Sequence, residues 1–359
     1  MAQRVFCGLL LVTATLAAAA GVCFGFEAPV FVPLGESIQS AIDAAAPGAV
    51  IALGEGTYRE SLVIDRSLTL RGSADGTTIK GTEREAAVRI RGEGITVRLE
   101  NLTVHGGRGW DGHGIQTEGS PAVGLVGVTT TENSWCGIWA KDRSLLSLEA
   151  CRIVGNGTHG IYTWDFTRLD LRGCEISGNK THGILALHVS ELCLADCTIS
   201  GNLSGVWAWD GARFHATRTP IGGNTLNGLV GQNAALIDLA SCSVSENGQY
   251  GLWFSDSSRG VLQDCEIRAN GADGAFVEMD GIVEFSRCVV RENAGVGIRA
   301  ATPSCVGSFD PSRPFKGWIE GEGNDVPGPE KEGGNMQGGL CPSYPGSLWP
   351  KGFLIDRPG

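Results

Sequence analysis

The chain has 359 residues and is acidic, with 28 Lys and Arg against 39 Asp and Glu and a formal net charge of −11 at pH 7. Its 54 glycines and its low fraction of charged residues, 19%, are typical of a turn-rich all-β protein. Such a surface repels nucleic acid and anionic lipid, and it repels an acidic polysaccharide unless a cation bridges the two.

Residues 1–25 have the pattern of a signal peptide. Arg4 precedes an apolar run over residues 8–20 that ends in small residues and is too short to span a membrane stably. We therefore expect a mature chain, from about residue 26, that is secreted, periplasmic or at the cell surface and has no transmembrane span. Lipid attachment at Cys23 is an alternative, although Val22 is an unusual residue before a lipidated cysteine.

Residues 33–46 predict a short amphipathic helix. Ser37 suits the N-cap, and Ile38, Ala41, Ile42 and Ala45 fall on one face. Such a helix would cover the open apolar end of a repeat protein.

From Cys151 to Ala301 the chain repeats one unit of about 23 residues. An asparagine and, shortly after it, a glycine mark each unit. The asparagines are Asn133, Asn156, Asn179, Asn202, Asn224, Asn247, Asn270 and Asn293, and the glycines are Gly137, Gly160, Gly183, Gly205, Gly228, Gly251, Gly274 and Gly297. A fixed period in this range indicates a solenoid.

The pattern inside each unit is that of strands. Leu169, Leu171, Cys174 and Ile176 alternate with polar residues, which is the periodicity of a half-buried strand. One unit fits three short strands and three turns, which is one coil of a parallel β-helix with coils about 4.8 Å apart. We expect the corner glycines to have positive φ and the asparagines to bond the backbone of the next coil. Ligand binding is the alternative role of these asparagines.

These repeats, together with the residue 33–46 opening, resemble the right-handed parallel β-helix (pectin-lyase-like) superfamily, especially its NosD-like members. The resemblance covers residues 34–302 and implies an all-β fold. We expect a single right-handed parallel β-helix of about ten to eleven coils over residues 26–302, with an N-terminal capping helix. An irregular Pro/Gly-rich segment, 303–359, follows, in which Cys305 and Cys341 are expected to form a disulfide.

A local insertion of three residues falls within the GGRGWDGHG segment before Gly114. An insertion in a solenoid becomes a protruding loop, often on the binding face. His113, with Asp111 and Glu118 nearby, suits general acid–base catalysis. The alternative is structural, with imidazoles stacked at a turn.

The strand after each corner glycine carries outward-facing aromatic side chains. They are Trp139, Tyr162, Trp164, Trp207, Trp209 and Trp253, to which the inserted loop adds Trp110. An exposed aromatic patch usually marks a binding surface, and flat rings at a regular spacing suit the apolar faces of sugars. The alternative is that another part of the protein or another subunit covers these rings.

An acidic line ends the same strands. It consists of Asp142, Asp165, His188, Asp210, Asn233, Asp256 and, less regularly, Asp280. Asp is a common turn residue, but stacked carboxylates also suit Ca²⁺. His159 and His182 would be neighbours on adjacent coils, close enough to share a metal with Asp165 or Asp142. No cofactor is required by the sequence.

The cysteines form a further line, which consists of Cys151, Cys174, Cys197, Cys242, Cys265 and Cys288, with Thr219 in the gap. They alternate in register with inward-facing Leu and Ile, so we expect a buried, reduced stack. Cys136 lies outside this line and is expected to face outward or into a corner.

Catalytic motifs of the superfamily do not transfer. The DGHG at 111–114 resembles part of the polygalacturonase and alginate epimerase motifs, without their other residues. Two hypotheses follow. In the first, the protein binds an extracellular polysaccharide or cell-surface glycan along the aromatic and acidic face, and an enzymatic version would be a polysaccharide lyase or glycoside hydrolase. In the second, it is a non-enzymatic NosD-like periplasmic accessory that presents its long face to a protein partner or a metal.

Overall fold

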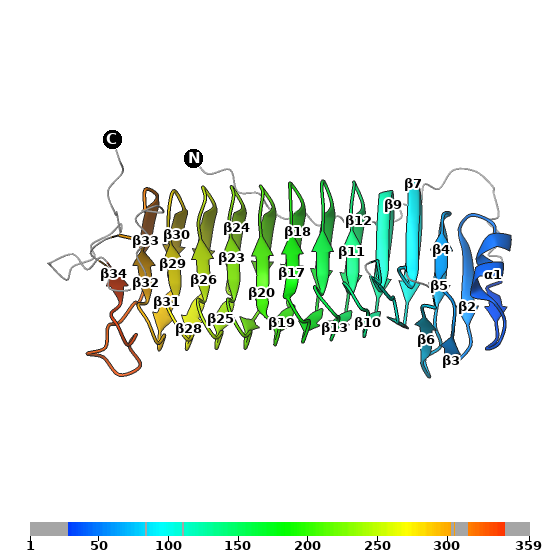
Figure 1. Ribbon diagram of the computed structural model, residues 1–359, viewed down its shortest axis with the longest axis horizontal. Helices are drawn as coiled ribbons and strands as arrows, with labels where there is room; N and C mark the ends of the chain where they lie inside the picture. Colours follow the sequence, from blue (N-terminus) through cyan, green and yellow to red (C-terminus); the bar gives the residue numbers. More distant parts are fainter. Residues whose placement is uncertain (1–27, 83–84, 110, 303–304, 306–314, 342–359) are drawn as a thin grey trace, which may run out of the picture.

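A computed structural model describes residues 28–82, 85–109, 111–302, 305 and 315–341. These residues form a parallel β-solenoid of about 12 turns, seen side-on as a row of coils in Figure 1. The predicted all-β, parallel β-helix class is confirmed, with slightly more turns than the expected ten to eleven. The predicted signal peptide, Trp110 and most of the C-terminal segment lie outside the described residues.

Each coil contributes strands to three walls. The first wall contains β4 (Leu62–Ile64), β11 (Ile138–Ala140), β14 (Ile161–Thr163), β17 (His182–Ala186), β20 (Ser204–Ala208), β23 (Leu229–Gly231), β26 (Leu252–Phe254), β29 (Ala275–Val277), β32 (Ile298–Ala300) and β34 (Leu340–Cys341). The second contains β1 (Val30–Val32), β2 (Ala49–Leu53), β5 (Leu68–Arg71), β12 (Leu145–Glu149), β15 (Arg168–Arg172), β18 (Glu191–Ala195), β21 (Arg213–Thr217), β24 (Leu236–Ala240), β27 (Arg259–Gln263), β30 (Ile282–Ser286) and β33 (Trp318–Glu322). The third contains β3 (Gly56–Tyr58), β6 (Thr77–Lys80), β8 (Leu102–His105), β10 (Thr129–Thr131), β13 (Arg152–Val154), β16 (Glu175–Ser177), β19 (Thr198–Ser200), β22 (Ile221–Gly222), β25 (Ser243–Ser245), β28 (Glu266–Arg268) and β31 (Val289–Arg291).

Two long strands join the first and second walls into one sheet of 23 strands. β7 (Val88–Glu100) and β9 (Ile115–Val126) run without interruption past the corner at which later coils turn. They pair in parallel, with a register shift between Glu93 and Thr96. The inserted loop predicted from the sequence lies directly before β9 and therefore beside the first wall.

The one helix of the described residues, α1 (Ile38–Ala44), lies at the N-terminal end of the solenoid (Figure 1). The Ser37 side chain accepts a hydrogen bond from the amide of Ser40, as expected of an N-cap, and Glu60 accepts from the amide of Ile38 at 2.7 Å. Ile38 and Ile42 are fully buried against the first coils. The helix predicted over residues 33–46 is therefore present but shorter.

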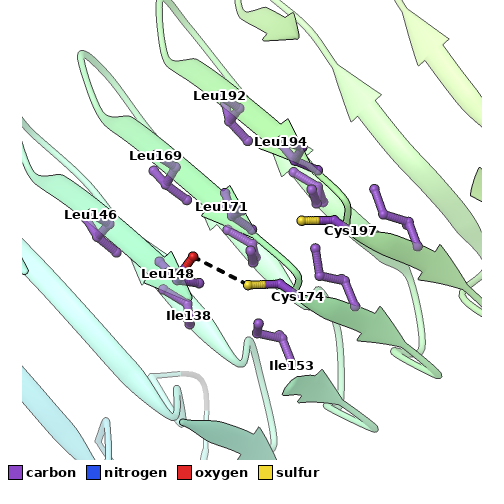
Figure 2. Close-up of a cluster of buried hydrophobic side chains, with 14 of the residues drawn as sticks. Ile138, Leu146, Leu148, Ile153, Leu169, Leu171, Cys174, Leu192, Leu194 and Cys197 are labelled. Atoms are coloured by element: carbon purple, nitrogen blue, oxygen red, sulfur yellow. Dashed lines mark hydrogen bonds between the residues drawn. The ribbon is translucent and has the colours of Figure 1, made fainter. Parts of the chain in front are cut away.

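The interior consists of stacked apolar files. Figure 2 shows Leu146, Leu169 and Leu192 in one file, with Cys174 and Cys197 in another. All six cysteines of the predicted line are buried and free, which confirms that prediction. The Cys174 Sγ lies 3.6 Å from the carbonyl oxygen of Leu148 one coil earlier, so the thiol both fills space and bonds the backbone. Cys136, expected to face outward or into a corner, is fully buried next to the corner glycine Gly137, so the outward alternative was wrong, and burial raises its pKa to about 12.

The repeated asparagines form a buried ladder inside one corner. The Asn179 Oδ1 accepts hydrogen bonds from the amide of Asn156 (3.0 Å) and from its Nδ2 (2.9 Å), and the Asn179 Nδ2 donates to the Ile153 carbonyl (3.1 Å) and to Asn202 (3.0 Å). The pattern continues to Asn335, which bonds Asn293 across 42 residues of sequence. These contacts confirm the structural role over ligand binding.

The corner glycines act through close approach and not through positive φ, so that expectation was wrong. A Cβ at Gly183 would lie 2.7 Å from the Gly205 carbonyl oxygen and 2.8 Å from the Asn202 Nδ2. The left-handed conformation occurs at other corners, for example at Gly178 (φ 64°) and Gly201 (φ 64°). The regular spacing of the asparagines and glycines therefore reflects one close contact that is repeated between coils.

The C-terminal coils depart from the 23-residue period but keep the stacking. β33 pairs with β30, β34 pairs with β32, and Val289 bridges Asp325. A disulfide joins Cys305 to Cys341, with Cα atoms 5.6 Å apart, at the end of the solenoid. The link between these two cysteines therefore closes the loop that follows the last regular coil.

Replacing one ladder asparagine should destabilise the solenoid. Asn179→Ala leaves buried donors and acceptors of two neighbouring coils unpaired, so we expect a loss of about 3 kcal/mol in the free energy of unfolding. Urea unfolding measures it, with Lys180→Ala, an exposed neighbour, as the control. Equal midpoints for the two variants would contradict the role assigned to the ladder.

Candidate functional site

Strand pairing along the first wall places its outward-facing side chains in one file. In order along the solenoid axis, the file consists of Arg89, Gln116, Trp139, Tyr162, Leu185, Trp207, Val230, Trp253, Phe276 and Arg299. The Trp139 and Tyr162 rings are parallel, with centroids 6.1 Å apart. The small, buried Val230 lets Trp207 and Trp253 meet across it at 6.4 Å.

A second file, at the corner just before the glycines, interlocks with the first. Together they form a continuous chain of ring contacts, which we call the aromatic ribbon. The ribbon consists of His113, Trp139, Tyr162, His159, His182, Trp207, Trp253, Tyr250 and Phe276, and consecutive ring centroids lie 4.7 to 6.4 Å apart. The four rings Trp139, Tyr162, Trp207 and Trp253 are half-buried, so their faces are in part open to solvent.

Trp164 and Trp209 widen the ribbon toward the next corner. The Trp164 ring lies 5.8 Å from Tyr162 and 4.4 Å from His188. Trp209 is 47% exposed, which is unusual for so large an apolar side chain. The predicted aromatic residues that the structure describes therefore lie on one wall and not on several.

Buried polar atoms beneath the ribbon lack partners. Among the described residues, those without a hydrogen bond include the Arg89 Nε, His113 Nδ1, Gln116 Oε1, Trp139 Nε1, His182 Nδ1 and Ser204 Oγ. His113 is 2% exposed, Gln116 4% and Ser204 fully buried. Native proteins rarely leave such groups unsatisfied without an ordered water or a ligand to complete them. The ribbon thus combines apolar ring faces with unused hydrogen-bonding capacity.

The histidines of the ribbon are neutral at physiological pH. Burial lowers the pKa of His113 to about 3, and the positive charges of Arg89 and Lys141 act in the same direction. Burial and the neighbouring imidazoles lower the pKa of His159 to about 3, and burial lowers that of His182 to about 4. The His159 Nδ1 also contacts the Thr181 hydroxyl at 2.8 Å. These rings stack and form hydrogen bonds, but they carry no positive charge near pH 7.

The predicted acid–base group is not assembled. His113 is buried beneath Trp139, with ring centroids 4.7 Å apart, and its Nδ1 has no partner among the described residues. Asp111 lies on the exposed turn of the inserted loop, and Glu118 forms an ion pair with Lys141 at 3.0 Å. An imidazole with a pKa near 3 is a weak base, and its acidic imidazolium form is absent near pH 7, so His113 is poorly suited to the predicted role.

The acidic line lies at the corner between the first and second walls. We call its four carboxylates, Asp142, Asp165, Asp210 and Asp256, the acidic rail. All four have left-handed backbone, with φ between 51° and 63°, and the Asp142 Oδ2 accepts a hydrogen bond from the Gly119 amide at 2.7 Å. Met279, not Asp280, occupies the equivalent left-handed position in the last of these coils. Turn geometry therefore explains part of the preference for Asp.

His188 stands between two carboxylates of the rail. Its Nδ1 lies 3.7 Å from an oxygen of Asp165 and 3.9 Å from one of Asp210. The predicted metal-binding trio of His159, His182 and Asp165 is not brought together, because the two imidazoles stack on each other at 5.2 Å while Asp165 faces His188. Within the described parts of the chain, no group of three or more His, Cys, Asp or Glu side chains is arranged to hold a metal ion.

Sequence reasoning placed Gln116 in the outward file with Trp139 and missed its charged end, Arg89. Arg89 and Gln116 continue the aromatic file on β7 and β9, in register with Trp139. The three-residue insertion shifts the period between Arg89 and the later coils, which hid the alignment of Arg89. Arg89 pairs with Glu85 at 3.2 Å. The signal available in the sequence was the alternation of apolar and polar residues in the segments VRI and IQT. This alternation aligns Arg89 with Gln116.

A surface hollow of about 410 Å³ lies elsewhere, in the early coils. Its lining includes Ser73, Thr77, Asn101, Thr103 and Gly127. These residues belong to the corner beside the third wall, so the hollow is separate from the ribbon. The hollow is therefore not part of the candidate site.

The chain matches a family of known proteins. Matches to the family model described as right handed beta helix region cover residues 67–226 and 164–306, about two thirds of the chain. The chain therefore belongs to this family, as the sequence resemblance implied. Comparison with curated proteins gives no match.

Solved structures of the same fold include enzymes that act on polysaccharides. The A-module of the mannuronan C-5 epimerase AlgE4 from Azotobacter vinelandii is similar at a TM-score of 0.68 and 17% identity, over 86% of this chain and 93% of that one. The AlgE6 A-module from the same organism gives 0.62 at 17% identity, over 86% and 95%. The periplasmic alginate epimerase AlgG gives 0.54 at 15%, over 80% and 76%. At such identities the likeness shows the fold.

The described residues contain no helix that is both long and apolar enough to cross a membrane.

The ribbon histidines should not titrate near neutrality. Because burial holds the pKa values of His113, His159 and His182 at about 3 to 4, the imidazole NMR signals of these three should stay unchanged between pH 8 and pH 5. His→Gln variants assign the signals. Unfolded histidines bind protons below about pH 6.5, so the folded chain should also lose stability as the pH falls through that value. A midpoint near the ordinary value for any of the three would contradict their burial.

Proposed function

We propose that the protein binds a polysaccharide along the aromatic ribbon. The observation that carries the proposal is the continuous chain of nine rings over the first wall, with unpartnered polar atoms beside them. Sugars present an apolar C–H face and a rim of hydroxyl groups. The ring faces suit the apolar C–H face.

The geometry favours a long, linear ligand. Equivalent side chains repeat at each coil, about 4.8 Å apart, so the ribbon runs parallel to the solenoid axis. It extends from His113 to Phe276. A polymer contacts many coils at once, so weak contacts at each ring add up along the chain.

Binding is better supported than catalysis. The ribbon histidines are uncharged at neutral pH, and Glu118 is neutralised by Lys141. The polysaccharide epimerases of the same fold add weight to a polysaccharide ligand in general, and AlgG is described as periplasmic. We propose, with the signal-peptide pattern of residues 1–25, that this chain acts outside the cytoplasm.

A protein-binding scaffold is the second candidate. It is favoured by a row of exposed apolar side chains at the corner beyond the rail, where Leu145 is 51% exposed, Phe166 63% and Val189 49%. A contiguous apolar patch of this kind is typical of a protein contact. Variants of this row and of the ribbon separate the two candidates.

Truncating ribbon tryptophans should weaken retention by polysaccharide. Affinity electrophoresis in gels that contain a neutral, an anionic or an amino polysaccharide measures it. We expect Trp164→Ala and Trp207→Ala each to lower the affinity about tenfold, because each removes one stacking surface.

Trp318→Ala, on the second wall, is the matched control and should leave retention unchanged. Unchanged retention of both ribbon variants, or no retention of the unmodified protein in any gel, would overturn the proposal.

A further inference from the structure

We infer that the polysaccharide carries protonated amino groups, so that the ligand of the ribbon is an amino-sugar polymer. The inference rests on the proposed function and goes further by naming the class of sugar. The structural basis is the position of the acidic rail directly beside the rings. The rings alone favour a sugar with an apolar face. The rail bears on the charge of the substituents next to that face.

The rail and the ribbon form one surface. The Trp164 ring contacts His188 at 4.4 Å, and His188 in turn lies between Asp165 and Asp210 at 3.7 and 3.9 Å. Trp209, 47% exposed, directly precedes Asp210 in the chain. A sugar stacked on these tryptophans therefore places its substituents toward carboxylates.

The cations of the same face are already neutralised. Lys141 pairs with Glu118 at 3.0 Å, and Arg89 pairs with Glu85 at 3.2 Å. At the far end of the file, Arg299 pairs with Asp273 at 2.8 Å. Among the described residues, Arg143, Arg213 and Arg259 near the rail form no ion pair. Arg143 lies over the ring of Phe166 at 5.7 Å, beyond the rail, and Arg213 and Arg259 begin β21 and β27 of the second wall. The face thus keeps an excess of negative charge.

Turn geometry alone does not require these carboxylates. The corner between the second and third walls has the same left-handed backbone, and residues of several kinds occupy it. They include Ala150, Gly173, Arg218, Ser241 and Arg287, with φ between 46° and 58°. A left-handed corner position can therefore hold a neutral or a basic residue as well as Asp. Four Asp side chains at the one corner that borders the ribbon supply charge that the turn does not need.

Charge and rings together suit an ammonium group. A protonated amine gains from a nearby carboxylate and also from the face of an aromatic ring. An anionic sugar would meet repulsion from the rail, and a neutral sugar would gain nothing from it. The unpartnered Ser204 Oγ and His182 Nδ1 lie buried beneath the rings and do not decide between these classes of sugar.

The test compares oligomers of one length whose sugars carry an amine, an acetylated amine or a carboxylate. Glucosamine oligomers, their N-acetylated counterparts and uronate oligomers are titrated by calorimetry in mildly acidic buffer of low ionic strength. The ribbon histidines stay neutral there, because their pKa values are about 3 to 4. We expect the amino form to bind about fivefold or more tightly than the acetylated form, and added salt to reduce the difference.

A double variant, Asp165→Asn with Asp210→Asn, tests the rail itself. Asn tolerates left-handed backbone, so the fold is kept. The control is Asp196→Asn with Asp264→Asn, which changes the net charge equally at left-handed corners (φ 55° and 54°) away from the ribbon. The rail variant should bring the affinity for the amino form down to that for the acetylated form, and the control should not.

The outcomes separate the two proposals. Equal binding of the amino and acetylated forms, tighter binding of the uronate form, or an equal effect of rail and control variants overturns the amino-sugar inference and leaves the ribbon as a polysaccharide site. If none of the three oligomers and none of the three polysaccharides is bound, the proposed function fails, and the inference fails with it.

Discussion

The parallel hydrogen-bonded register between coils is the constraint on which the rest of the structure depends. It is fixed at one corner by the buried ladder that runs from Asn133 to Asn335, in which each amide serves the coils on both sides. The ladder can continue from one coil to the next only because the corner glycines let neighbouring backbones approach closely, as at Gly183. Because each coil then has the same orientation, residues separated by one period lie directly above one another.

That register creates the site without any further folding event. A single aromatic side chain on a strand is an ordinary surface residue, but repetition of Trp139, Tyr162 and Trp207 on successive or near-successive coils makes a surface of stacked rings. Stacking also removes the interleaved imidazoles from water, which is why His159 and His182 have low pKa values. The same geometry that assembles the ribbon therefore makes it unsuited to proton transfer.

The sequence predicted what depends on periodicity and missed what depends on local detail. The wall, the buried cysteines and the outward position of the tryptophans follow from a period of 2 within strands and about 23 between coils. The reason for glycine at Gly183 was missed, because positive φ and close approach both select glycine. Arg89 was missed because an insertion and two long strands break the period there. The protonation of the histidines depends on burial, which the period does not give.

Solenoids separate the residues that fold the chain from those that face a ligand. Inward files and the asparagine ladder hold the coils, whereas each outward position contacts only its neighbours on adjacent coils, so it can change with little effect on stability. This explains how a chain 17% identical to the AlgE4 A-module keeps the same fold over 86% of its length. It also means that fold likeness carries little information about the ligand. The choice of sugar must be argued from the outward files themselves, and here these are rings bordered by Asp142, Asp165, Asp210 and Asp256.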